Sequence, residues 1–234
     1  SHSNIFTFNK KILSKTIKGL KNGDIVGLPT ETVYGVGGNA YSKKAVNKIF
    51  KLKGRPKFNP LIIHYRSLED ADQDVVMNKY VKQLYKQFCP GPLTFVLKRK
   101  RTSKVNQIAC AKLKTIAIRF PKNKIVRTIL KRTDFPLAMP SANRSNNVSP
   151  VNSLDVFDEF KKKLKIIIDG GKCKIGIEST VIDLTSSPKI LRPGVIDIKA
   201  IEKALKIKLK RNKSSKKILS PGMMKKHYSP GIPV

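Results

Sequence analysis

Several features that define common protein classes are missing from this chain of 234 residues. Its three cysteines are odd in number and form no Cys-x-x-Cys pair, which argues against a disulfide framework and against a zinc knuckle. No apolar run is long enough to span a membrane, and no signal-peptide core is visible. We therefore expect a soluble protein of the cytoplasm, with reduced cysteines and no membrane partner.

Acidic residues are also scarce. The chain has 15 Asp and Glu against 49 Lys and Arg, which gives a formal net charge of +34. A field of this sign attracts polyanions such as tRNA, nucleotides or anionic lipid. The lysines are spread along the whole chain, so a generally lysine-rich composition would give the same count. The charge alone therefore leaves open whether nucleic acid is a partner.

Signature motifs of covalent and metal-dependent catalysis are absent as well. The chain contains no Walker P-loop, no Gly-x-Ser-x-Gly elbow and no His-Glu-x-x-His, and its histidines belong to no plausible Ser-His-Asp set. Any reaction must then depend on positioning and charge stabilisation. No site in which the protein itself holds a metal is predicted.

The best candidate for a binding loop lies at residues 25–40. Residues 25–28 predict a buried strand, and residues 29–40 predict a loop at its end, where open α/β sheets place ligands. Thr30 and Thr32 supply hydroxyls, Tyr34 supplies an aromatic face with a polar tip, and three glycines allow the backbone to approach a ligand. An ordinary strand-to-helix turn would carry the same glycines, so this motif is weak by itself.

Apolar periodicity divides most of the chain into helices and strands that interleave too irregularly for a simple βαβ array. Helices are predicted at residues 10–22, 42–50, 75–88, 125–132, 154–164 and 197–205, and strands at 25–28, 61–65, 95–97, 116–121, 137–139, 166–168, 181–183 and 190–194. We predict an α/β (α+β) fold in residues 1–208, with helices packed on a twisted mixed β-sheet that carries a basic concave cavity. Residues 209–234 are expected to form a basic linker segment.

Cationic and hydroxyl side chains recur at the predicted ends of these elements. They are Thr32, Lys53, Arg55, Arg119, Ser141, Asn143, Ser179 and Arg192. All of them can donate to anionic oxygens, so together they predict a pocket for phosphates and carboxylates. Arg119 interrupts an apolar strand and is either a paired structural charge or a ligand clamp. His64, at the end of another strand, is either a hydrogen-bonded core residue or a catalyst.

Six short motifs occur along the chain in a fixed order. They are P-T-E-T-V-Y-G at 29–35, K-x-R at 53–55, P-G-P-L-T at 90–94, P-S-A-N at 140–143, E-S-T-V at 178–181 and L-R-P-G at 191–194. This series resembles the YrdC family of threonylcarbamoyl-AMP synthases. The resemblance implies a YrdC-like fold and a nucleotidyltransferase. The enzyme would join L-threonine, bicarbonate and ATP into L-threonylcarbamoyladenylate and pyrophosphate, for threonylcarbamoyl-adenosine modification of tRNA.

The resemblance also implies roles for individual residues. Threonine would be bound by Thr32, His64, Arg119 and Ser179, with Met139 contributing through its backbone. The nucleotide would be held by Lys53, Arg55, Asn59, Thr115, Ser141, Asn143, Ser149 and Arg192, with Tyr228 lying over it as part of a lid. Lys53 and Arg55 would be catalytic because they offset charge that develops on the phosphates. Mg²⁺ would arrive on the ATP phosphates and need few protein carboxylates.

The resemblance leaves partners to be inferred. Downstream tRNA threonylcarbamoyl-transferase proteins would receive the product, and tRNA or double-stranded RNA could bind directly. An alternative from another class is a non-catalytic double-stranded RNA or tRNA-binding module, which the net charge alone would also favour. A third is a carbamoyl-transfer domain of the hydrogenase-maturation type. Proteins of that type carry acylphosphatase and Cys-rich zinc segments that this sequence lacks.

Overall fold

The structure is a computed structural model that describes residues 1–211, and within this range the strands form one eleven-stranded sheet. The strands are β1 (Ile5–Thr7), β2 (Val26–Leu28), β3 (Gly35–Asn39), β4 (Ile62–His64), β5 (Leu93–Lys98), β6 (Thr115–Arg119), β7 (Leu137–Ala138), β8 (Ile167–Asp169), β9 (Thr180–Asp183), β10 (Lys189–Arg192) and β11 (Lys210–Arg211). Their order across the sheet is β1-β8-β2-β3-β7-β4-β6-β5-β9-β10-β11.

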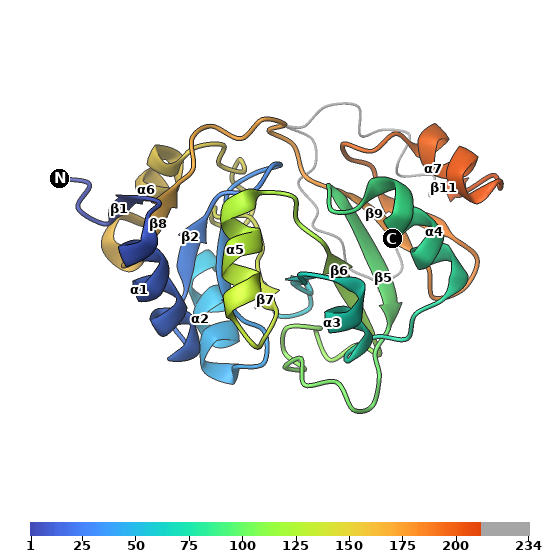
Figure 1. Cartoon of the computed structure of the whole chain (residues 1–234), viewed down its shortest axis with the longest axis horizontal. Coiled ribbons are helices and arrows are strands. Elements are labelled where there is room, and N and C mark those ends of the chain that lie inside the picture. Colours follow the sequence, from blue (N-terminus) through green and yellow to red (C-terminus); the bar gives the residue numbers. More distant parts are fainter. Residues whose placement is uncertain (212–234) are drawn as a thin grey trace.

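The sheet is mixed, as the irregular interleaving predicts. Parallel pairs such as β4 with β6 and β5 with β9 alternate with antiparallel pairs such as β2 with β3 and β5 with β6. The helices are α1 (Lys10–Lys21), α2 (Lys43–Lys53), α3 (Leu68–Asp72), α4 (Lys79–Phe88), α5 (Lys124–Arg132), α6 (Ser153–Phe160) and α7 (Ile198–Leu205), with a 3-10 turn, η1, at Lys161–Lys163. In Figure 1, α1, α2, α5 and α6 gather at one end of the sheet and α4 and α7 at the other. The expected α/β architecture is confirmed.

Helix α2 illustrates how local sequence fixes an element that serves the site. The Ser42 hydroxyl accepts a hydrogen bond from the Ala45 amide at 3.1 Å and caps the N-terminus. Gly54, at φ 59°, adopts the left-handed conformation that ends the helix. The chain therefore turns directly after Lys53, which places Arg55 beyond the helix end.

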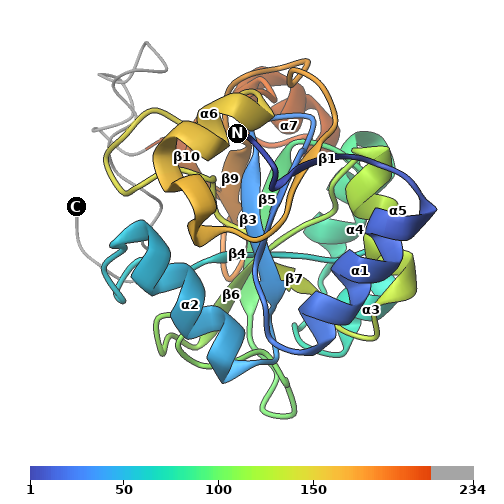
Figure 2. The same ribbon diagram turned by 90° about the vertical axis from the view of Figure 1, so that its left-hand side faces the viewer.

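Two apolar clusters attach the helices to the sheet. Ile17 of α1 and Ile129 of α5 share one cluster with Leu28 of β2. Phe50 of α2 and Phe160 of α6 belong to a second, larger cluster. Figure 2 shows α1 and α5 on one side of β2 and β3, with α2 on the other. None of the helices within residues 1–211 is long and apolar enough to cross a membrane.

The expectation that residues 29–40 form a loop is wrong in its second half, because Gly35–Asn39 is strand β3, paired antiparallel with β2. The glycines serve packing there. A Cβ on Gly35 would lie 2.5 Å from Cγ of Met139, and one on Gly37 would lie 3.1 Å from a methyl of Leu28. At the other end of the sheet, residues 210–211, which fall in the expected linker segment, pair with β10 as β11.

Candidate functional site

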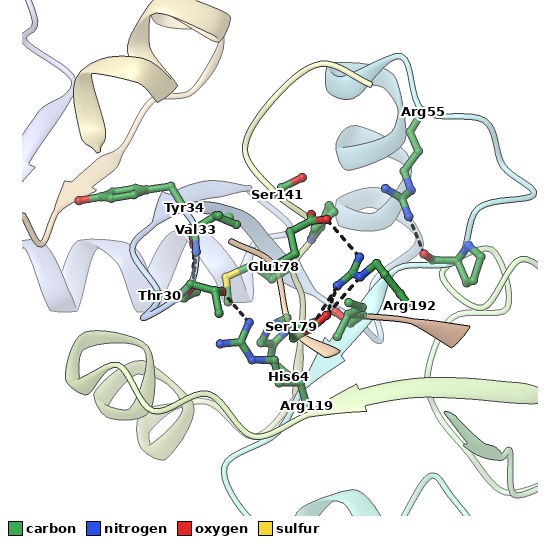
Figure 3. Close-up of a pocket in the computed structure, with 16 residues that line it drawn as sticks. Thr30, Val33, Tyr34, Arg55, His64, Arg119, Ser141, Glu178, Ser179 and Arg192 are labelled. Atoms are coloured by element: carbon green, nitrogen blue, oxygen red, sulfur yellow. Dashed lines mark hydrogen bonds and ion pairs between the residues drawn. The ribbon is translucent and has the colours of Figure 1, made fainter. Parts of the chain in front are cut away.

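A single cavity collects most of the residues that the motifs predict. Its lining includes Thr32, Arg55, His64, Arg119, Met139, Ser141, Ser179 and Arg192. The cavity has a volume of about 540 Å³ when its mouth, which opens to solvent, is included. Figure 3 shows the three arginines and the short hydroxyl side chains around this hollow. They come from six separate segments of chain, so the fold, rather than any one motif, creates the site.

The strand register explains why these segments meet. In the parallel pair of β4 and β6, His64 lies beside Arg119 at the end of both strands. On the other side of β6, Thr94 lies beside Arg119, and Thr94 in turn pairs with Val181 of β9. Ser179 immediately precedes β9, and its hydroxyl lies 2.7 Å from that of Thr94. One edge of the sheet therefore presents the imidazole, the guanidinium and the hydroxyl together.

Arg119 is held by three groups around its guanidinium. Nη1 donates to the Thr32 hydroxyl at 2.9 Å, Nη2 lies 2.8 Å from the Glu31 carboxylate, and Nε donates to the Gly91 carbonyl at 3.3 Å. The side chains of Arg119 and Glu31 are 6% and 9% exposed. The Glu31 carboxylate also accepts the Lys122 amide at 2.9 Å. Arg119 is thus a paired charge, and its remaining surface faces the cavity.

Arg192 is fixed in a similar way at the end of β10. Its Nη2 and Nε donate to the Ser179 carbonyl at 2.8 and 3.2 Å, and Nη1 lies 3.2 Å from the Glu178 carboxylate. The turn after Arg192 crosses the E-S-T segment closely. A Cβ on Gly194 would lie 2.4 Å from the Thr180 amide nitrogen. The glycine of L-R-P-G is required because no side chain fits between these two backbones.

Arg55 and Lys53 have different environments although they share the K-x-R motif. Arg55 lines the cavity, where it donates to the Asn59 carbonyl at 3.1 Å and to the Pro60 carbonyl at 2.6 Å. Burial lowers the pKa of Arg55 to about 10, so the guanidinium stays charged at neutral pH. Both hydrogen bonds end on neutral carbonyls, and the nearby Glu178 carboxylate favours the charged form of the guanidinium.

Lys53 does not line the cavity. Its amine donates to the carbonyls of Ser141 and Asn143 at 2.5 and 2.6 Å, which ties the end of α2 to the P-S-A-N loop. Burial, reinforced by the nearby Arg55 charge, lowers the pKa of Lys53 to about 7. The side chain is 1% exposed, so its clearest role in the structure is to position that loop.

His64 is a neutral side chain in this site. It is 2% exposed, and burial followed by the Arg119 charge lowers its pKa to about 3. Its Nδ1 lies 3.1 Å from the Ile62 carbonyl. Ser141, in contrast, has a buried hydroxyl without a hydrogen-bond partner among residues 1–211. An imidazole that stays uncharged and a free hydroxyl offer hydrogen bonding to a ligand without adding charge.

The first half of the 25–40 stretch is a true loop, and its backbone is tightly held. The Thr30 hydroxyl donates to the Val33 carbonyl at 2.5 Å and lies 2.9 Å from the Thr32 hydroxyl. The Tyr34 ring points away from the cavity, and its hydroxyl donates to the Gly171 carbonyl at 2.7 Å (Figure 3). The Tyr34 ring, which was expected to offer an aromatic face to a ligand, is instead buried inside the protein. Tyr34 contributes its backbone to the cavity wall.

Five predicted residues lie elsewhere, and a sixth is not among the residues that the structure describes. Thr115 begins β6 at the far end from Arg119 and does not line the cavity, nor does Asn59. Asn143 is 1% exposed and donates to the carbonyls of Arg144 and Asn147. Ser149 lines a separate hollow with the acids of α6. Lys53 holds the P-S-A-N loop, as described above. Tyr228 falls outside the described residues. The ligand roles of these six stay predictions.

The sequence motifs did not reveal the acidic partners of the arginines. Glu31 and Glu178 belong to P-T-E-T-V-Y-G and E-S-T-V, and each faces a cavity arginine. A signal was available, because an acid inside an apolar motif of a chain with only 15 acids needs a cationic partner. Thr30 was noted for its hydroxyl, but the structure adds its role in shaping the loop.

The donors of the cavity do not form a metal site. Among the described residues there is no group of three or more His, Cys, Asp or Glu that could hold an ion. The one carboxylate that lines the cavity, Glu178, lies against Arg192. The cationic lining of the cavity suits an anionic guest.

Comparison with known proteins agrees with this geometry. The family model Sua5/YciO/YrdC, described as "Telomere recombination", matches residues 18–194. A threonylcarbamoyl-AMP synthase of Pyrococcus abyssi is 41% identical over 92% of this chain and 64% of its own length, and that of Bacillus subtilis is 36% identical over 92% and 63%. The crystal structure of P. abyssi Sua5 complexed with L-threonine superposes with a TM-score of 0.84, at 38% identity, over 88% of this chain and 62% of that one. This chain thus spans less than two thirds of these relatives.

Proposed function

The chain belongs to the Sua5/YciO/YrdC family, and from this membership together with the arginine-lined cavity we propose that it is a threonylcarbamoyl-AMP synthase. It would convert L-threonine, bicarbonate and ATP into L-threonylcarbamoyladenylate and pyrophosphate. The observation that carries the proposal is the convergence of Arg55, Arg119 and Arg192 on one hollow. Three buried guanidinium groups suit a guest with several negative charges, such as a triphosphate beside an amino-acid carboxylate.

The two substrates would occupy different parts of the cavity. Arg119, with Thr32 and Ser179 near it, is suited to the carboxylate and hydroxyl of threonine, and Met139 and His64 would border the small side chain. The L-threonine complex of the P. abyssi protein supports a threonine site in this fold. Arg55, Arg192 and the Ser141 hydroxyl, which has no partner within residues 1–211, remain for the nucleotide phosphates.

The chemistry would proceed without a covalent enzyme intermediate. The neutral threonine amine attacks the carbon dioxide that forms when bicarbonate loses hydroxide. A carbon–nitrogen bond forms, and the proton that the amine gives up joins the hydroxide as water, which leaves a carbamate. A carbamate oxygen then attacks the α-phosphorus, forming one oxygen–phosphorus bond while the bond to the β-phosphate oxygen breaks. Pyrophosphate leaves with the bonding electron pair. Arg55 and Arg192 would stabilise the charge that develops on the phosphates, a contribution that a preorganised, partly dry site strengthens. Lys53 would act by holding the loop that carries Ser141.

Mg²⁺, when bound to the triphosphate, would supply further charge neutralisation for the leaving pyrophosphate. The product would pass to tRNA threonylcarbamoyl-transferase proteins, and a cytoplasmic location fits such a role. Within this proposal residues 1–208 form the catalytic domain and residues 209–234, with Tyr228, form the linker or lid.

The test is a pyrophosphate-release assay on the full chain with ATP, L-threonine and bicarbonate. We expect release that depends on all three substrates and is lost when threonine is replaced by valine, which lacks the hydroxyl. Mass spectrometry should detect threonylcarbamoyladenylate in the same reaction. A folded protein that releases no pyrophosphate above a threonine-free control would contradict the proposal. The Arg55→Ala variant should fold normally and lose turnover, because the two hydrogen bonds of Arg55 end on carbonyls of its own loop.

A further inference from the structure

Glu31, the acid of the P-T-E-T-V-Y-G motif, reaches Arg119 although it does not itself line the cavity. Its side chain is 9% exposed, and its Oε1 lies 2.8 Å from Nη2 of Arg119. The other carboxylate oxygen, Oε2, accepts the Lys122 amide at 2.9 Å, and the Glu31 carbonyl accepts the Ile175 amide at 3.1 Å. Two separate segments of chain therefore fix the acid before any ligand binds.

The contact between Glu31 and Arg119 is an ion pair and not an aligned hydrogen bond. Within residues 1–211, neither Oε1 of Glu31 nor Nη2 of Arg119 has a hydrogen-bond partner, although both atoms are buried. Arg119 is oriented through its other two nitrogens, since Nη1 donates to the Thr32 hydroxyl and Nε to the Gly91 carbonyl. Buried donors of this kind normally have a partner, so the N–H groups of Nη2 are suited to a ligand that enters the cavity.

The groups around Arg119 carry no net charge. The Glu31 carboxylate cancels the guanidinium. His64 is uncharged at neutral pH because burial, followed by the Arg119 charge, lowers its pKa to about 3. The Cys89 thiol is also uncharged, because burial raises its pKa to about 12. Thr32 adds only a hydroxyl. This end of the cavity therefore presents an arginine without presenting an excess of positive charge.

The end of the cavity at Arg55 differs in this respect. Figure 3 shows Arg55 and Arg119 on different sides of the hollow. Arg192 is balanced by Glu178 at 3.2 Å, but Arg55 adds a further charge whose two hydrogen bonds end on neutral carbonyls. A triphosphate, which carries several negative charges, suits the end with the excess positive charge. A zwitterionic amino acid, whose own charges cancel, suits the balanced end at Arg119.

We propose that Glu31 determines which substrate binds at each end of the cavity. By cancelling the charge of Arg119 without occupying the Nη2 donors, Glu31 lets this end accept the carboxylate of a zwitterionic amino acid and reject phosphate groups. Without the acid, a phosphate would bind at Arg119 and exclude threonine. Glu31 acts through Arg119 and is thus a positioning residue. The inference rests on the proposed function for the identity of the two substrates.

The test is isothermal titration calorimetry of the full chain with L-threonine, without and with inorganic phosphate. In the wild type, phosphate should displace threonine only weakly. Glu31→Gln keeps the size of the side chain but removes its charge. We expect the ratio of the competitive phosphate constant to the threonine dissociation constant to fall at least about tenfold in this variant, because a charge is lost beside a buried site. Glu31→Asp keeps the charge and should hold the ratio within about threefold of the wild type.

The matched control, Asp24→Asn, removes a carboxylate from a second concavity, which lies between α1 and α2. We call this concavity the lysine groove. Its basic lining residues are Lys15, Lys18, Lys48, Lys51, Arg144, Lys163 and Lys165. It shares no lining residue with the cavity, and Asp24 lies 3.2 Å from the Lys48 amine there. Asp24→Asn should therefore leave the ratio within about twofold of the wild type, because solvent screens a distant exposed charge.

Several results would overturn the role of Glu31. They are an unchanged ratio in Glu31→Gln, an equal fall in Asp24→Asn or Glu31→Asp, and strong competition by phosphate in the wild type. If Glu31→Gln does not fold, the wild type and Glu31→Asp decide the question, because strong competition by phosphate in either one contradicts the proposal.

Threonine-dependent pyrophosphate release, measured on the same wild-type sample, separates this inference from the proposed function. A wild type that binds threonine but releases no pyrophosphate contradicts the enzymatic proposal, and the ratio in Glu31→Gln still decides the role of the acid. Release by the wild type together with an unchanged ratio contradicts only the role of Glu31. A wild type that does not bind threonine contradicts both.

Discussion

The cavity and the lysine groove are both cationic, but the two regions hold their charges in opposite ways. Arg55, Arg119 and Arg192 are at most 8% exposed, and each is fixed by carbonyls, hydroxyls or a carboxylate. The groove lysines are mostly exposed, and in the part of the chain that the structure describes only Lys48 is in an ion pair. A fixed guanidinium has already lost its freedom before a ligand arrives, whereas each ordered lysine loses up to about 2 kcal/mol of rotamer entropy on contact. The cavity is therefore preorganised for one guest in one orientation, whereas the groove is not.

Exchanging the two cationic residue types should give the largest contrast. The change Arg119→Lys keeps the charge but removes the fork that meets Thr32, Glu31 and Gly91 at once. We expect kcat/KM for threonine in pyrophosphate release to fall about 100- to 1000-fold, as when an oriented donor is lost from a preorganised site.

The reciprocal change Lys51→Arg in the groove is the control for that exchange. It should leave the same rate within twofold, because Lys51 is exposed and lines the groove, not the cavity. Circular dichroism of Arg119→Lys would show whether the variant is folded. A folded Arg119→Lys protein with wild-type activity would mean that charge alone, without a fixed orientation, serves the cavity.

Removing the acid from an ion pair should also affect the two regions differently. Glu31→Gln leaves the buried Arg119 charge without its carboxylate partner, and we expect the free energy of unfolding to fall by about 2 to 3 kcal/mol. Asp24→Asn breaks the Lys48 pair at the groove, where the two side chains are 35% and 41% exposed, and should cost less than about 1 kcal/mol. Urea denaturation at pH 7 measures both values. Equal losses would show that burial does not distinguish the two pairs.

The sequence predicted the mixed sheet, most of helix α2, and most of the residues that meet in the cavity. These predictions held because local signals, such as the Ser42 cap and Gly54, agree with the tertiary structure. Prediction from the sequence failed where an interaction joins segments that are far apart along the chain. The run of glycines in β3 looked like a loop because the sequence does not show that Met139 packs directly on Gly35. The pairing of Glu31 with Arg119 across 88 positions was invisible for the same reason.

Lys53 and Lys51 show the same contrast within helix α2, because Lys53 is buried and Lys51 is exposed. Because burial lowers the pKa of Lys53 to about 7, the unfolded chain binds more protons than the folded protein between about pH 7 and pH 10. The contribution of Lys53 to the free energy of unfolding therefore rises with pH across that window. Relative to Lys53→Met, the wild type should gain about 1 to 2 kcal/mol in unfolding free energy from pH 7 to pH 9.

Lys51→Met is the matched control for this pH effect. The wild type and Lys51→Met should differ by the same small amount, within about 0.5 kcal/mol, at both pH values, because surface substitutions rarely do more. Guanidinium denaturation at the two pH values measures all three proteins. If the difference between the wild type and Lys53→Met stays constant with pH, the Lys53 amine keeps its proton in the folded protein and the two carbonyls that it contacts outweigh its burial.

Raising the salt concentration should weaken the exposed ion pair of the groove but change threonine binding in the cavity very little, which is the smallest effect predicted for the cavity. Between about 50 and 500 mM salt, screening acts on exposed charges, so the loss of unfolding free energy caused by Asp24→Asn should fall by about half. The cavity arginines are buried with their partners, and KM for threonine should change less than about twofold over the same range. Urea denaturation and pyrophosphate release measure the two quantities. A threonine KM that rises steeply with salt would mean that the cavity attracts its amino acid through the field of the whole surface, and that the fixed pairs around Arg119 contribute little to binding.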